Sequence, residues 1–364
     1  MIVLAACTDD RGNVQGSAAD SADTAAACAA DDPCLVWTAD YGEPPVGPVA
    51  GDGVVLVPAD GATRALEGAT GAERWAYEPE FIDLNMQVDA GVALASTADG
   101  LQAFELDSGD VRWTFDGAES SALGDGVVWV IGDHAITELD LETGVAGTSW
   151  TIESNVWGYP RVDGELLCTA NEEAYVLNLA TGAVLIDDAY GSDVGRGSIH
   201  CAVSAGVAVF AWYDLEAEHF VGGATAWDAA TGTELWTRDE PEAWLWAPIV
   251  AAGTLLLGRT TADRVPSILA LDLATGEEIW EQPTAGYDYA PHPLVVGELV
   301  GDVSDEGVVE AWSVATGDPA WTLALDEPVS DGFTLYGWPT AADGWVYAAT
   351  SVDGTGRLYA VRGP

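Results

Sequence analysis

A phrase of 11 residues recurs along most of the chain and limits the architectures that the chain can adopt. Each complete copy starts with Ala, runs through a short strand-like stretch, turns at a Thr-Gly or Ser-Gly pair and ends with Trp. The five complete copies are 65–75, 103–113, 226–236, 270–280 and 311–321. With two degenerate copies there are seven turn glycines, Gly71, Gly109, Gly144, Gly182, Gly232, Gly276 and Gly317, and the gaps between them are 38, 35, 38, 50, 44 and 41 residues. A period of about 41 residues predicts one structural unit per copy, packed against its neighbours.

Each copy carries the signals of a tight β-hairpin. A stretch such as Ala-Leu-Asp-Leu at 270–273 alternates as a strand does when one face is buried. The glycine allows the positive φ of the turn, and a short polar side chain four residues earlier, such as Asp272, can bond the turn amides. The tryptophans after the turn are Trp75, Trp113, Trp236, Trp280 and Trp321. Because a flat ring recurs at one place in each unit, we expect these side chains to wedge between neighbouring sheets.

The repeat predicts an all-β fold, a β-propeller whose blades are four-stranded antiparallel sheets. Two more strands precede each phrase, for example at 49–57 and 123–130, and helical solenoids lack this two-residue alternation. Residues 34–364 number 331, so a period of 41 gives eight blades, with seven as the alternative. The last unit, 338–362, lacks its outer strand, whereas Leu35-Val36-Trp37 has no unit of its own. We therefore expect this N-terminal strand, with Trp37, to close the ring and leave no long unpaired edge.

The segment before the repeat divides into two parts. Leu4-Ala5-Ala6-Cys7 resembles the lipobox of bacterial lipoproteins, in which the cysteine is acylated, although a chance cysteine after apolar residues is the alternative. Only six residues precede Cys7, too few for a secretory signal, so 1–7 is expected to be a truncated lipoprotein signal. Residues 8–33 are rich in Ala and Asp and lack aromatic residues, which predicts a disordered tether. We expect a single propeller domain at 34–364, anchored to the lipid bilayer of the cell membrane on its extracytoplasmic side.

The charge excludes one class of partner. Sixty Asp and Glu residues face 11 Arg and no Lys, which gives a formal net charge of −49. Nucleic-acid binding needs clustered cations, and electrostatic docking on an anionic membrane needs them too. We interpret the acids as a solvated shell around a tryptophan-wedged core.

The cysteines fit an exported protein. Beyond Cys7 there are four, and an oxidising compartment would allow the disulfides Cys28–Cys34 and Cys168–Cys201. The alternative for Cys168 and Cys201 is that both are small buried apolar side chains.

The phrase resembles the repeat of pyrroloquinoline-quinone (PQQ)-type β-propellers over nearly all of 35–362. That resemblance covers quinoprotein dehydrogenases, BamB-like lipoproteins of outer-membrane protein assembly, and other exported propellers. Under the dehydrogenase alternative the chain would bind PQQ with calcium. However, no adjacent pair of cysteines occurs, only ten Arg lie beyond residue 34, and the four His are scattered without metal-ligand spacing. We therefore expect no catalytic residue, metal or cofactor, and a quinone-binding oxidoreductase remains the alternative.

Aromatic and proline residues gather in the connections between blades, at 155–160, 243–248, 286–293 and 335–339. In a propeller such connections lie on one face, and exposed aromatic clusters serve as binding platforms. The alternative is that half of them plug the centre of the ring. The candidate binding face comprises Trp157, Tyr159, Trp244, Trp246, Tyr287, Tyr289, Tyr336 and Trp338. The sequence thus predicts a monomeric, non-catalytic scaffold for an unidentified envelope protein or small ligand.

Overall fold

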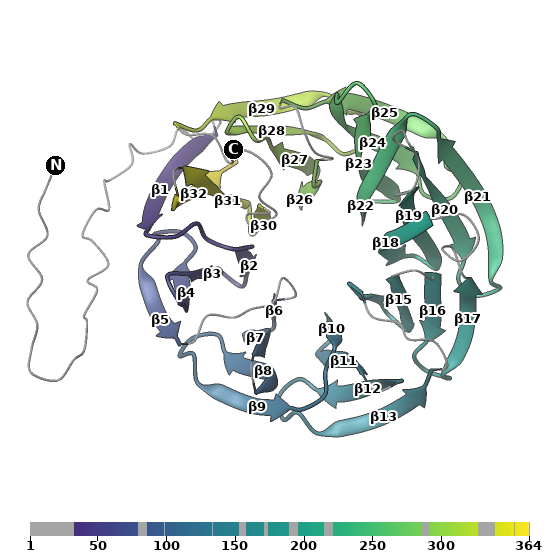
Figure 1. Ribbon diagram of the computed structural model, residues 1–364, viewed down its shortest axis with the longest axis horizontal. Helices are drawn as coiled ribbons and strands as arrows, with labels where there is room; N and C mark the ends of the chain where they lie inside the picture. Colours follow the sequence, from purple (N-terminus) through teal and green to yellow (C-terminus); the bar gives the residue numbers. More distant parts are fainter. Residues whose placement is uncertain are drawn as a thin grey trace, which may run out of the picture.

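Eight four-stranded antiparallel sheets form a closed ring in the computed structural model (Figure 1). The structure describes residues 33–78, 86–97, 99–132, 134–152, 158–170, 174–188, 196–214, 221–285, 291–326, 339–352 and 354–363. The protein is therefore an eight-bladed β-propeller, as the spacing of the repeat predicts, and the seven-bladed alternative is wrong.

In each blade the strands are ordered outwards, with the first-named strand of the sheet nearest the ring centre and the last at the circumference (Figure 1). Blades 1 and 2 contain β2 (Val49–Gly51), β3 (Val54–Ala59), β4 (Ala62–Glu67), β5 (Glu73–Tyr77), β6 (Gln87–Asp89), β7 (Val92–Thr97), β8 (Gly100–Glu105) and β9 (Val111–Phe115). Blades 3 and 4 contain β10 (Ser120–Gly124), β11 (Val127–Gly132), β12 (Ala135–Asp140), β13 (Ala146–Thr151), β14 (Arg161–Asp163), β15 (Leu166–Ala170), β16 (Ala174–Asn178) and β17 (Ala183–Asp188). Blades 5 and 6 contain β18 (Arg196–Ser204), β19 (Val207–Asp214), β20 (Gly222–Asp228), β21 (Thr233–Glu240), β22 (Ala243–Ala251), β23 (Thr254–Thr261), β24 (Pro266–Asp272) and β25 (Glu278–Pro283). Blades 7 and 8 contain β26 (Leu294–Val296), β27 (Leu299–Val303), β28 (Val308–Ser313), β29 (Pro319–Ala324), β30 (Thr340–Ala342), β31 (Trp345–Val352), β32 (Thr355–Arg362) and β1 (Cys34–Tyr41).

The apolar core lies between the blades. One buried cluster joins Leu56 of blade 1 to Ala93 and Phe104 of blade 2, and similar clusters occupy the other junctions. The second strand of a blade is often buried on both faces, as in β3, where all six residues are buried. The outermost strands are the most exposed, as in β13, where five of six residues are exposed. A single blade therefore buries its apolar faces only when both neighbours are present.

The N-terminal strand closes the ring. β1 pairs antiparallel with β32 and supplies the outermost strand of blade 8 (Figure 1). The indole N–H of Trp37 on β1 donates to the carbonyl of Gly68 in blade 1 at 2.8 Å. This pairing confirms the predicted closure.

Tryptophans join most blades to the next. The indole N–H of Trp321 in blade 7 makes no hydrogen bond to a described residue, whereas six other indole N–H groups donate to a backbone carbonyl of the following blade, in the pairs Trp37–Gly68, Trp75–Leu106, Trp113–Leu141, Trp150–Leu179, Trp236–Leu273 and Trp280–Val314. The ring also lies against the turn glycine of that blade, so that a Cβ on Gly109 would lie only 2.6 Å from the ring of Trp75. The glycine thus serves two needs, the positive φ of the turn and the close approach of the ring.

Trp150 is a wedge that the repeat phrase does not reveal. It lies six residues after Gly144, not four, and its ring still covers Gly182 of blade 4. The shift of two residues keeps the side chain on the same face of the strand. The pairing of β12 with β13 has a β-bulge, as do the corresponding strand pairs of blades 1 and 2, so the bulge does not account for the shift.

The junction between blades 4 and 5 has a disulfide where the other junctions have a tryptophan. The position four residues after Gly182 is Ile186, and a Cβ on Gly232 of blade 5 would meet the carbonyl of Leu185, not an indole ring. Cys168 on β15 and Cys201 on β18 form a disulfide across this junction, with Cα atoms 6.3 Å apart. A covalent bond thus links the two blades that lack the wedge.

Cys34 is also disulfide-bonded. The predicted partner, Cys28, lies outside the described residues, as do Cys7 and the whole of 1–32.

Many acids occupy structural positions in the turns. Four residues before the glycine, Asp140, Asn178, Asp228 and Asp272 accept hydrogen bonds from turn amides, as predicted. Where Glu stands at this position the longer side chain instead pairs with an arginine, as Glu105 does with Arg112. Other aspartates at hairpin tips accept an amide N–H from the next blade, in the pairs Asp343–Gly53, Asp52–Gly91 and Asp163–Ala205.

Candidate functional site

Blades 5 and 6 have longer innermost strands than most other blades. β18 and β22 have nine residues each, whereas β2, β6, β14, β26 and β30 have three. The segment 243–248, predicted above as a loop, is therefore part of a strand, and that prediction is wrong. Its first residues pair with the end of β23, with Leu245 opposite Arg259.

A buried ion network supports this extension. Glu240, at the end of β21, accepts a hydrogen bond from Arg238 at 2.7 Å and forms a salt bridge with Arg259 at 3.0 Å. Because a buried carboxylate is tolerated only when it is paired and hydrogen-bonded, both guanidinium groups are needed to hold Glu240 there. The network fixes the turn that leads into β22.

The backbone of β22 bends directly after Trp246. The register with β23 shifts between Trp246 and Ile249, and Ala247 has a φ of 43°, in the left-handed region that non-glycine residues rarely adopt. Within the described strands, Ala247 is the only non-glycine residue with a positive φ. Such local strain persists only where the surroundings enforce it, and it often marks a functional site.

Aromatic side chains from three consecutive blades meet beside this bend. Tyr159, just before β14, stacks on His200 of β18 with ring centroids 5.7 Å apart and 12° between the planes. His200 in turn lies 5.9 Å from Trp246 of β22, and the rings of Trp246 and Trp244 are 6.3 Å apart. All four rings are half-buried, so each retains surface that a ligand could contact.

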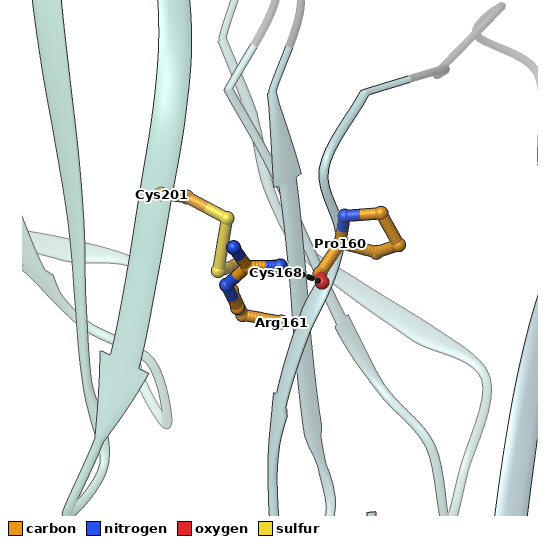
Figure 2. The surroundings of a disulfide bond; sticks show 4 residues. All are labelled: Pro160, Arg161, Cys168 and Cys201. Carbon is orange, nitrogen blue, oxygen red and sulfur yellow. Dashed lines mark hydrogen bonds between the residues drawn. A yellow bond between two sulfur atoms is a disulfide. The ribbon is translucent and has the colours of Figure 1, made fainter. Parts of the chain in front are cut away.

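Arg161 lies next to these rings. Arg161 on β14 lies opposite Cys168 on β15. The disulfide from Cys168 to Cys201 on β18, the neighbour of His200, therefore fixes β15 relative to β18 (Figure 2). The guanidinium donates a hydrogen bond to the carbonyl of Pro160 at 3.1 Å. Its side chain is exposed, yet the surrounding protein desolvates it enough to lower its pKa. We call Tyr159, Arg161, His200, Trp244 and Trp246 the inner cluster.

His200 is neutral at physiological pH. Desolvation, with smaller contributions from the charges of His292 and Arg161, lowers its pKa to about 3. His292, just before β26, is likewise neutral, because desolvation lowers its pKa to about 4. The arginine is therefore the only fixed charge of the inner cluster.

Asp302 is a buried acid beside the segment that carries His292. Burial, opposed by hydrogen bonds from the amides of Val303 and His292 and assisted by the charge of Glu310, raises its pKa to about 7. Because the pKa is raised in the folded state, the stability that the protonated form provides is complete below about pH 4 and is lost as the pH rises through 7.

Asp302→Asn should remove this pH dependence. Between pH 5 and pH 8 this group should reduce the wild type's free energy of unfolding by about 3 kcal/mol, because pH 5 lies about two pH units below the pKa of Asp302 and each unit is worth about 1.4 kcal/mol. The amide oxygen of Asn can still accept the two backbone hydrogen bonds. Urea unfolding from pH 5 to pH 8 should show the variant losing less stability than the wild type, and Glu306→Gln, an exposed acid of the same blade, should follow the wild type. Parallel pH profiles for wild type and Asp302→Asn would contradict the assignment.

Three of the eight residues predicted for the binding face lie within the described residues. The structure brings Tyr159, Trp244 and Trp246 together. Trp157, Tyr287, Tyr289, Tyr336 and Trp338 lie outside the described residues.

Arg161 and His200, which join the described members of the binding face, were missed from the sequence. The signal for Arg161 is its place directly after the Gly-Tyr-Pro of a proline-rich connection in a chain with few arginines.

The described residues fit a PQQ–calcium site poorly. Arg161 offers one cation for the cofactor's carboxylates, and the described residues contain no group of three His, Cys, Asp or Glu side chains placed to hold a metal ion. The disulfide Cys168–Cys201 is buried between strands, where it cannot lie over a cofactor ring.

A family model described as outer membrane protein assembly factor BamB matches residues 21–193, 184–301 and 266–363. The chain belongs to the BamB family. Together the three matches extend over the whole ring of this BamB-family propeller.

Solved structures with the same fold include both branches predicted from the phrase. BamB from Moraxella catarrhalis is 17% identical with a TM-score of 0.59, and the alignment covers 90% of this chain and 99% of that one. The quinohemoprotein alcohol dehydrogenase ADHIIG from Pseudomonas putida HK5 is 13% identical with a TM-score of 0.58, covering 91% and 76%. At these identities the likeness establishes the fold alone.

A curated relative is the serine/threonine-protein kinase AfsK of Streptomyces coelicolor, 28% identical over 199 residues. The alignment covers 53% of this BamB-family chain but only 22% of the kinase.

None of the described residues forms a helix long and apolar enough to cross a membrane.

Proposed function

We propose that this BamB-family propeller is a non-catalytic scaffold that binds a protein of the cell envelope through the inner cluster and the aromatic connections around it. The observation that carries the proposal is the stack of half-buried rings from Tyr159, His200 and Trp246, which three different blades present together. Large rings with accessible surface are the side chains that contribute most to protein interfaces.

The setting supports an envelope location. The disulfide Cys168–Cys201 fits an oxidising compartment, and the family description refers to the outer membrane. Acylation of Cys7 would hold the head at the bilayer through the 8–33 tether, and the net charge of −49 keeps such a head soluble.

The test compares partner binding by wild type and variants. Affinity-tagged full-length protein is crosslinked in its host's envelope, purified, and the adducts are identified by mass spectrometry. Tyr159→Ala/Trp246→Ala should reduce the dominant adduct at least tenfold, because the anchoring rings of an interface carry most of its energy. The matched control, Val111→Ala/Val145→Ala, removes exposed apolar side chains from blades 2 and 3 and should leave the adduct unchanged. Unchanged capture by the ring variant would contradict the proposed face.

A further inference from the structure

The charge at the inner cluster is opposite to that of the protein as a whole. The formal net charge is −49, and six arginines elsewhere are matched by acids. Ion pairs with carboxylates involve Arg64, Arg74, Arg112, Arg238, Arg259 and Arg357. Arg161 has no such pair in the described part of the chain, and its hydrogen bond to Pro160 uses one of its five N–H donors. Arg161 thus lacks a carboxylate partner in a strongly acidic chain, as does Arg362 of blade 8 among the described residues, but Arg161 is the one beside the inner cluster's rings.

The surroundings of Arg161 raise the energy of this isolated charge. Nearby protein desolvates the guanidinium and lowers its pKa, and no carboxylate contributes an opposing effect. A desolvated cation without a partner is costly, and an anion that pairs with it recovers that cost. The side chain is also exposed, so that an anion can reach it.

His200 is a second polar group whose hydrogen-bonding capacity is unused. Its imidazole lies against the rings of Tyr159 and Trp246, and neither ring nitrogen takes part in a hydrogen bond within the described part of the chain. Because the imidazole is neutral, one nitrogen can donate and the other can accept. Arg161 and His200 therefore offer one positive charge and several donors beside stacked aromatic surface.

We propose that the inner cluster binds a carboxylate that is attached to a flat apolar group. The guanidinium of Arg161 would hold the two carboxylate oxygens through parallel N–H donors, the geometry in which arginine binds carboxylates most strongly. The flat group would lie against Tyr159 and Trp246. Because the site has one fixed cation, it should favour a ligand with a single negative charge. The disulfide Cys168–Cys201 holds the strands that carry Arg161 and His200 at a constant separation.

This inference is independent of the proposed function, because a site for a free aromatic acid needs no protein partner. The same chemistry could come from a small acid or from the C-terminal carboxylate of a chain that ends in an aromatic residue.

Ligand-observed NMR titration of the full-length protein tests the site with benzoate and with its neutral counterpart benzamide. Benzoate should bind saturably, and benzamide should bind at least tenfold more weakly because it lacks the charge. Arg161→Gln should weaken benzoate at least tenfold and leave benzamide unchanged. Arg161→Lys keeps the charge but loses the paired donors, so its affinity for benzoate should lie between those of the wild type and Arg161→Gln. Arg362→Gln, an exposed arginine over the ring of Trp345 in blade 8, is the matched control and should bind as the wild type does.

The outcomes separate clearly. Equal affinity for benzoate and benzamide, wild-type affinity in Arg161→Gln, or no saturable benzoate binding would each overturn the proposal. Arg161→Gln alters an exposed side chain, and a circular dichroism spectrum and melting curve like those of the wild type confirm that it folds.

A second pair of probes distinguishes the two sources of carboxylate. Tighter binding of N-acetylglycyl-phenylalanine than of benzoate, abolished in its C-terminal amide, would assign the site to a chain terminus. Tighter binding of benzoate would assign it to a free acid.

Discussion

Gly109→Ala should destabilise the protein by about 3–4 kcal/mol, more than a single methyl group on a surface turn would ordinarily cost. Gly109 has a φ of 74°, and a Cβ there would lie 2.6 Å from the ring of Trp75. The methyl group must displace a buried indole whose N–H donates to Leu106 at 2.8 Å, so that packing and a hydrogen bond are lost together. Urea unfolding of wild type and variant measures the loss.

Gly91→Ala is the matched control for the backbone contribution. Gly91 lies in the same blade with the same φ of 74°, but a Cβ there would meet no atom within 4 Å. It should cost only about 1–2 kcal/mol, the price of a left-handed alanine. The difference between the two variants measures the close approach of the tryptophan. Equal losses would show that the wedge contributes nothing beyond the turn conformation.

Loss of the Cys168–Cys201 disulfide should be comparably severe, at about 3–4 kcal/mol. The bridge spans 33 residues, and restricting a loop of that length in the unfolded chain gives a stabilisation of this size. It also crosses the junction where Ile186 stands in place of a tryptophan. In Cys168→Ala/Cys201→Ala, urea unfolding should show the loss.

Hydrogen exchange locates the effect. The amides of β17 and β18 should lose protection before those of other blades in the double variant, because their junction would retain neither wedge nor bridge. Wild-type protein treated with a reductant, which also breaks the disulfide of Cys34, is the control and should lose at least as much stability as the variant. A loss below about 1 kcal/mol, or uniform exchange around the ring, would contradict this role for the disulfide.

The ring was predictable because each unit carries its own turn and strand signals. The turn glycines from Gly71 to Gly317 give the period of about 41 residues, the length of 331 residues then gives eight units, and Trp37, which has no unit of its own, identifies the closing strand. Trp150 escaped notice because it stands two residues further along its strand than the tryptophans of the phrase, where its side chain still points to the same side.

The candidate site was less predictable because its members are distant in sequence. The aromatic connections pointed to Tyr159 and Trp246, but their contact with His200 arises only when blades 4, 5 and 6 take their places in the ring. Pro248 suggested a loop, whereas pairing of Leu245 with Arg259 extends the strand through it. Such long-range pairing has no local signature.

The central claim is that this propeller binds its partner through the inner cluster, and site-specific photo-crosslinking tests it most directly. A benzophenone amino acid placed at Trp244, at the edge of the rings, should give one dominant adduct in the cell envelope. The same group at Val145, 65% exposed on blade 3, should give none. Equal adducts from both positions, or adducts from Val145 alone, would contradict the assignment of the inner cluster as the binding site.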